Sequence, residues 1–358
     1  MTRLDLPVVW SDEVLRHEPG AEIWVGVSTP GTEVPERATV IRDAVVAAGA
    51  TLVPAVASRG ASLLAEVHTP ELLTHLESVY DEWVAAGFLD YPGQDRVVPY
   101  VFPTPAMLDG LPARRPTAIH ARAGAFCYDT MTLIGPDTWA AARAAADAAA
   151  TAADLAAAGT PVTYAITRPP GHHATPGGYG GSCYLNNAAV AVAGLRAAGA
   201  RRVAIIDIDA HHGNGTQAIF YSSAEVRYAS VHVDPGAGWF PHYAGFADET
   251  GVGAGAGANL NLPLDPGSGD AAWLAGVEEL CRFASGVDAV VVSLGVDAAE
   301  LDPESPLRVS SDGYRATGAL IAALGVPTVA VHEGGYHLPT LGALTVATLT
   351  GLQDRHNS

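Results

Sequence analysis

Two aspartates and a histidine directly follow an apolar run near the middle of the chain. The run 203–206 leads into Asp207, Asp209 and His211. A short β-branched apolar run is typical of a strand buried in a parallel sheet. Because alternate residues of an extended backbone point the same way, Asp209 and His211 can reach one ion together. Buried carboxylates need a neutralising partner, so the pattern predicts a divalent metal at the carboxyl end of the sheet.

Other side chains suited to acid–base chemistry follow other apolar runs. His172 and His173 lie in a loop rich in Pro and Gly, Asp297 ends a buried run, and Tyr336 follows a Gly-Gly pair. Carboxyl ends of parallel strands share one edge, so these groups are expected to meet. A metal would polarise a carbonyl and lower the pKa of water, a histidine would transfer protons, and a phenol would stabilise an oxyanion. Together they predict metal-assisted hydrolysis.

Alternating strand and helix patterns predict the scaffold, an α/β fold with a parallel sheet sandwiched by helices. Strands are expected at 51–54, 162–166, 203–208, 228–233, 287–293 and 327–331. Helices are expected at 36–48, 139–158, 188–198, 271–285 and 312–324. The segments 86–120 and 234–270 show no regular pattern and are interpreted as site-forming loops.

The charge and the cysteine content of the chain indicate which kinds of partner and which cellular compartment to expect. The net charge of −19, from 38 acidic and 19 basic residues, disfavours nucleic acid and suits a small cationic substrate. The three cysteines, Cys127, Cys183 and Cys281, have no paired spacing, which argues against a disulfide framework. Neither a membrane span nor a signal peptide is predicted, so we expect a cytoplasmic protein.

The motifs at 168–174, 203–215, 293–297 and 332–336 stand in an order that resembles the zinc-dependent histone deacetylase family, including its bacterial acetylpolyamine amidohydrolases. The resemblance extends from 34 to about 352 and implies the arginase/deacetylase fold, with 1–358 as one catalytic domain. It implies that Asp209, His211 and Asp297 bind zinc, with ferrous iron as the alternative ion in cells.

The same resemblance implies roles for the groups around the metal. His172 and His173 would flank the attacking water, with His173 as the proton shuttle, and Tyr336 would stabilise the oxyanion. Asp207 would accept a hydrogen bond from His172. Asn214 stands opposite His173 where many members have Asp, so His173 should be less basic here.

A structural potassium ion is also implied by the resemblance. The matching positions, some contributing main-chain oxygens, are Asp207, Asp209, His211, Ser230 and Val231. Arg37 matches an arginine that lines an internal channel for acetate exit.

The substrate tunnel departs from the family pattern. Ser182 stands where many relatives have an aromatic wall residue, Phe240 keeps the opposite wall, and Tyr179 is expected to replace the lost ring. Glu304 matches an acid at the tunnel mouth of polyamine-selective members, where a carboxylate would attract an ammonium. A solvated loop acid is an equally simple interpretation of Glu304.

The sequence argues against two other classes of protein. A ureohydrolase would need two manganese ions and aspartates where this chain has Gly213 and Gly295. A binding module with an inactive site would lack a ligand or a catalytic group, and none is missing. The preferred function is therefore deacetylation of a small acetylated amine such as an acetylpolyamine, with protein acetyl-lysine as the alternative substrate. The segment 86–120 could mediate a homo-oligomer or cap the tunnel.

Overall fold

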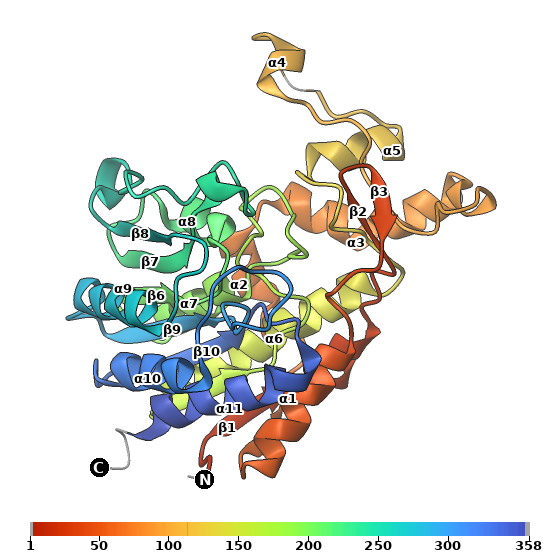
Figure 1. Ribbon diagram of the computed structural model, residues 1–358. Helices are drawn as coiled ribbons and strands as arrows, with labels where there is room; N and C mark the ends of the chain where they lie inside the picture. Colours follow the sequence, from red (N-terminus) through yellow and green to blue (C-terminus); the bar gives the residue numbers. More distant parts are fainter. Residues whose placement is uncertain (1–2, 113, 355–358) are drawn as a thin grey trace.

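An eight-stranded parallel sheet forms the centre of the molecule (Figure 1), a computed structural model that describes residues 3–112 and 114–354. Its strand order is β4-β1-β5-β10-β9-β6-β7-β8. The bounds are β1 (Pro7–Trp10), β4 (Thr51–Pro54), β5 (Val162–Ala165), β6 (Val203–Asp207), β7 (Val226–Val233), β8 (Asn259–Leu264), β9 (Ala289–Leu294) and β10 (Thr328–His332). The central strands are buried on both faces, as their apolar runs predict.

Helices cover both faces of the sheet, which confirms the predicted α/β class. Val203 and Ile205 of β6 pack with alanines of α6 (Thr138–Ala157) and α7 (Asn187–Ala197). Ala204 and Ile206 point the other way, into the core shared with Trp273. The helices on that side are α1 (Glu36–Ala47), α9 (Asp270–Phe283), α10 (Ser311–Ala322) and α11 (Leu338–Asp354). Alanine combines high helix propensity with a small side chain, which lets α6 lie close to the sheet.

The two faces of the sheet each have an apolar core. A third apolar cluster lies to one side of the sheet, on α2 (Ala61–Val67), α3 (Pro70–Ala85) and α5 (Ile119–Arg122). A small hairpin of β2 (Glu22–Trp24) and β3 (Val27–Thr29) lies nearby, and the arm with α4 (Pro105–Leu108) projects away from the body (Figure 1). The remaining short elements are α8 (Asn214–Phe220), η1 (Asp12–Arg16), η2 (Phe88–Asp90), η3 (Ala123–Ala125), η4 (Pro235–Ala237) and η5 (Gly253–Gly255).

Both segments interpreted as irregular loops contain regular structure. The segment 86–120 includes η2 and α4, and 234–270 includes the edge strand β8. In β8 the inward positions are Asn259 and Asn261, whose side-chain amides donate to Gln217 Oε1 at 2.9 and 2.8 Å. Because the residues of β8 that face inward are polar, the strand lacks the apolar pattern by which a buried strand is predicted from sequence. The sequence reading also missed β1, the β2–β3 hairpin, α2, α3 and α11. Within the two described ranges, no helix has the length and hydrophobicity needed to cross a bilayer.

Candidate active site

The candidate active site lies where four neighbouring strands of the sheet, β5, β10, β9 and β6, end. His172 and His173 follow β5, and Tyr336 follows β10. Asp297 follows β9, and the pair Asp209 and His211 follows β6. The parallel topology therefore brings together side chains that are far apart in the chain, as their positions after apolar runs predict.

Asp209, His211 and Asp297 form a candidate metal site. One ligand atom from each residue lies within 4.8 Å of the others. His211 Nδ1 is 3.3 Å from Asp209 Oδ1 and 3.1 Å from Asp297 Oδ2. The other ring nitrogen, Nε2, is 3.0 Å from the carbonyl oxygen of Glu304, so it is placed to donate its hydrogen there. That tautomer leaves the Nδ1 lone pair free for an ion.

The electrostatics of the three residues suit a divalent cation. Both carboxylates are buried. Burial and the neighbouring Asp209 raise the pKa of Asp297 to about 7. Two adjacent buried carboxylates repel each other, and a bound cation between them would stabilise both. Two carboxylate oxygens and one imidazole nitrogen are a donor set that fits a first-row divalent ion.

The two glycines that distinguish this chain from a ureohydrolase lie in tight surroundings. A Cβ at Gly295 would lie 2.3 Å from Asp209 Oδ2, and a Cβ at Gly213 would lie 2.3 Å from Asp207 Oδ2. Aspartates at these two positions would collide with Asp207 and Asp209 as they are placed here. The structure therefore has no room for the two additional aspartates of a ureohydrolase centre.

The two histidines after β5 have different partners and different charge. His172 Nδ1 is 3.1 Å from Asp207 Oδ2, and His173 Nδ1 is 2.7 Å from Asn214 Oδ1. Burial opposes the charge of His172, but Asp209 and Asp207 outweigh it and raise its pKa to about 10. Burial and the neighbouring His172 lower the pKa of His173 well below its ordinary value. His173 is therefore a neutral ring with Nε2 free to accept a proton.

The buried carboxylate of Glu333 binds the backbone of the loop that carries His172 and His173. The backbone N–H groups of Gly171 and His172 donate to Glu333 Oε2 at 2.7 and 3.1 Å. Burial raises the pKa of Glu333 to about 7. The sequence showed Glu333 inside the 332–336 motif, but its type and position alone assigned it no role.

Tyr336 is held in place by Arg37 and Asp302. The Arg37 guanidinium lies 4.5 Å above the Tyr336 ring and donates to the carbonyl oxygens of Gly335 and Glu333, both at 2.6 Å. Asp302 Oδ2 accepts from the Tyr336 N–H at 2.7 Å. Burial raises the pKa of Tyr336 well above its ordinary value, so its hydroxyl remains a donor. These contacts show how Arg37 supports the turn, and its expected place in an acetate channel stays a prediction.

A pocket of about 70 Å³ leads to these groups. Its lining includes the sequence-predicted residues His173, Ser182, His211, Phe240, Glu304 and Tyr336. Glu22, Thr32 and Met131 also line it and were not predicted. In the described part of the chain, no lining residue of this pocket comes from 86–120, and a role of that segment at the site stays a prediction.

The prediction that Tyr179 forms a tunnel wall was wrong. Its side chain is fully buried and stacks toward His75, with ring centroids 6.0 Å apart, and it is outside the described lining of the pocket. The Tyr179 backbone pairs with the segment 126–128, which directs its ring into the third apolar cluster. Tyr128 instead stacks with Phe240 at 6.4 Å, and its hydroxyl donates to the carbonyl oxygen of His173 at 2.7 Å.

Glu22 is the most consequential residue that the sequence reading missed. It lies on β2, and burial followed by the charge of Glu304 raises its pKa to about 7. The two carboxylates line one pocket. A three-residue strand has no detectable period, so only the folded chain reveals that Glu22 faces the tunnel.

The expected potassium positions are partly neighbours in the sheet. The register of β6 and β7 pairs Asp207 with Ser230, and Val231 is the next residue of β7. Asp207 also accepts from the hydroxyl of Tyr228 at 3.0 Å. Potassium at these residues stays a prediction.

A candidate Asp–His–Asp metal site beside a histidine pair and a half-buried tyrosine, at the strand ends of an α/β fold, is typical of a metal-dependent hydrolase. The model of the histone deacetylase domain matches residues 31–352, and the chain belongs to the histone deacetylase family. It is an amidohydrolase of that family, whose members depend on a metal cofactor.

Relatives and solved structures agree on this placement. The chain is 41% identical over 352 residues to an acetylpolyamine amidohydrolase of Mycoplana ramosa, covering 96% of this chain and 99% of the relative. It is 39% identical to acetylpolyamine amidohydrolase 1 of Pseudomonas aeruginosa, covering 96% and 98%. The crystal structure of acetylpolyamine aminohydrolase from Burkholderia pseudomallei superposes with a TM-score of 0.88 at 38% identity, covering 97% and 98%.

Proposed function

We propose that this enzyme removes acetyl groups from small cationic amines, with acetylpolyamines as the preferred substrates, and that the chain acts as one catalytic domain. The observation that carries the proposal is the position of Glu22 and Glu304, which line the same pocket as His173, His211 and Tyr336. An amide at the catalytic groups would place a distal ammonium within reach of the two carboxylates. The names of the relatives support the same substrate class.

Asp209, His211 and Asp297 would hold the catalytic metal, proposed to be zinc with ferrous iron as the cellular alternative. When bound, the ion supplies Lewis acidity toward the amide carbonyl and toward water. A structural potassium ion is proposed at the β6–β7 end of the site. Its ligands would come from Asp207, Asp209, His211, Ser230 and Val231.

The side chains of the pocket supply proton transfer and charge stabilisation. Asn214 Oδ1 accepts from His173 Nδ1–H, which leaves Nε2 to take a proton from water and return it to the departing amine. The Tyr336 hydroxyl donates to the oxygen that becomes negative as the carbonyl is attacked. His172, bonded to Asp207, adds positive charge beside the same centre.

A substrate panel tests the proposal. We expect kcat/KM for acetylputrescine and acetylspermidine to exceed that for an acetyl-lysine peptide. Peptide turnover faster than every acetylpolyamine would refute the preference and favour a protein deacetylase.

A variant of Glu304 tests the role of the tunnel acid. Glu304→Gln keeps the shape and removes the charge, so it should lower kcat/KM for cationic amides and spare neutral ones. Glu300→Gln, at an exposed position outside the described lining of the pocket, is the matched control. Equal loss for cationic and neutral substrates would contradict the electrostatic role.

A further inference from the structure

The side chain opposite His173 is an amide, and an amide can face a histidine in two ways. The oxygen end of Asn214 accepts hydrogen bonds and the nitrogen end donates them. Asn214 Oδ1 is 2.7 Å from His173 Nδ1. In this orientation Nδ1 carries the ring proton and Nε2 is bare, as a base requires. If the amide turned over, Nδ2 would donate to Nδ1, and the proton of the neutral ring would lie on Nε2.

The other end of the amide contacts Tyr128. Asn214 Nδ2 donates to the Tyr128 hydroxyl at 3.4 Å, and this hydroxyl donates to the carbonyl oxygen of His173 at 2.7 Å. In residues 3–112 and 114–354, that buried carbonyl oxygen has no other hydrogen-bond donor from the protein. A tyrosine hydroxyl has one hydrogen, and turning it toward Asn214 would leave the carbonyl oxygen unpaired. The hydroxyl therefore stays an acceptor toward Asn214, and only the Nδ2 end of the amide suits this place.

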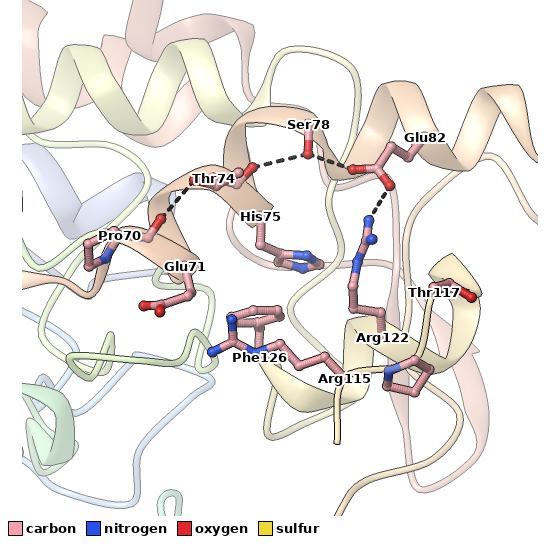
Figure 2. A pocket seen from close by; sticks show the side chains of 11 residues that line it. Pro70, Glu71, Thr74, His75, Ser78, Glu82, Arg115, Thr117, Arg122 and Phe126 are labelled. Atoms are coloured by element: carbon pink, nitrogen blue, oxygen red, sulfur yellow. Dashed lines mark hydrogen bonds and ion pairs between the residues drawn. The ribbon is translucent and has the colours of Figure 1, made fainter. Parts of the chain in front are cut away.

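Backbone hydrogen bonds fix the segment that carries Tyr128. Its N–H donates to the carbonyl oxygen of Tyr179 at 3.2 Å, and the Tyr179 N–H donates to that of Phe126 at 2.8 Å. Phe126 lines a larger pocket of about 450 Å³ beside α3 (Figure 2), where its ring stacks on His75 at a centroid distance of 4.3 Å. The Tyr128 ring lies against Gly180, where a Cβ would lie 2.3 Å from a ring carbon. These contacts determine where the Tyr128 hydroxyl lies.

We propose that Tyr128 is a positioning residue, which sets the tautomer of His173 by holding the amide of Asn214 in one orientation. The proposal rests on the proposed function, in which His173 Nε2 takes a proton from water. The Tyr128 ring also stacks with Phe240, so one residue connects the tunnel wall to the base. An aspartate in place of Asn214 would not need this contact, because both oxygens of a carboxylate accept hydrogen bonds.

A double-mutant cycle tests the role of Tyr128. Tyr128→Phe keeps the ring and removes the hydroxyl, so part of the Asn214 amide should turn over and kcat should fall about threefold to tenfold. In the Asn214→Asp background, the same substitution should change kcat by less than about twofold, since a carboxylate has no donor end. Each background is measured with acetylputrescine at its own pH optimum, because the aspartate also changes the basicity of His173.

Nitrogen NMR of metal-loaded enzyme, with isotope-labelled ring nitrogens in histidine, reads the tautomer without any substrate. The signals that disappear in His173→Gln identify the His173 ring. We expect the ring proton on Nδ1 in the unmodified enzyme and a substantial share of it on Nε2 in Tyr128→Phe. In the double variant Tyr128→Phe/Asn214→Asp, it should return to Nδ1.

Tyr243→Phe is the matched control. It removes a hydroxyl from a tyrosine that is 93% exposed and outside the described lining of the catalytic pocket, so kcat and the tautomer should not change.

The proposal is overturned by any of three results. These are an equal loss of kcat on Tyr128→Phe in both backgrounds, a His173 proton that stays on Nδ1 in Tyr128→Phe, and a His173 proton on Nε2 in the unmodified enzyme. The first result would show that Tyr128 acts through packing alone. Because the tautomer is read without substrate, its outcome is separate from that of the substrate panel, which tests the proposed function.

Discussion

Protonation of Glu22 should set how strongly the tunnel prefers cationic substrates. Burial and the nearby Glu304 raise the pKa of Glu22 to about 7. The ionised fraction of such a group rises from about one tenth at pH 6 to about nine tenths at pH 8. If the Glu22 carboxylate binds the substrate ammonium, the preference for a cationic over a neutral substrate should rise roughly tenfold across this range.

Paired substrates isolate this effect from the titration of the catalytic groups. We would measure kcat/KM for N-acetylputrescine and for N-pentylacetamide, in which a methyl group replaces the ammonium. The amine stays protonated between pH 6 and 8, because its pKa lies near 10. The pH dependence of His173 and of the metal site acts on both substrates, so it cancels in the ratio of the two values.

Glu22→Gln should lower this ratio at pH 8 and make it independent of pH. Glu18→Gln, an exposed acid on the same segment outside the described lining of the tunnel, is the control and should keep the tenfold rise. A ratio that does not change with pH in the unmodified enzyme would refute the reasoning. So would a Glu22→Gln variant that keeps the rise.

Three further substitutions probe the catalytic centre. Tyr336→Phe should keep the metal content, measured by elemental analysis, and lower kcat by about 10²-fold or more, and retained activity would remove Tyr336 from its role. Asn214→Asp should raise the pKa of His173, so the acidic limb of the kcat/KM profile should move up by about 1–3 pH units, and an unmoved limb would argue against His173 as the base. Gly295→Ala would place a Cβ 2.3 Å from Asp209 Oδ2, so the variant should lose bound metal on dialysis, and full metal retention would contradict the packing.

The scaffold was largely predictable because its signals are local. The runs that form β5, β6, β9 and β10 are apolar throughout, and a buried parallel strand requires this. Their boundaries shifted by only a few residues from the predicted ranges. The edge strand β8 was not predicted, because its inward residues Asn259 and Asn261 are polar. Their side-chain amides donate hydrogen bonds to Gln217, which lies on a segment distant in the chain.

The catalytic groups were predictable for a related reason. Side chains that follow buried parallel strands are carried to one edge of the sheet, so the types of Asp209, His211, Asp297 and Tyr336 already indicated metal-assisted hydrolysis. The family resemblance then assigned their roles. The structure adds the distances that let the ligand atoms share one ion.

The amino-acid sequence by itself therefore determined the fold class and the chemistry at the strand ends, because both follow from residue type and local period. Only the tertiary structure decided which side chains form the tunnel. The ring of Tyr179 packs in the apolar cluster beside α3. Glu22, on the N-terminal hairpin, lines the same pocket as Glu304. The direction of a loop side chain depends on packing between segments that are distant in sequence, and no local pattern records that packing.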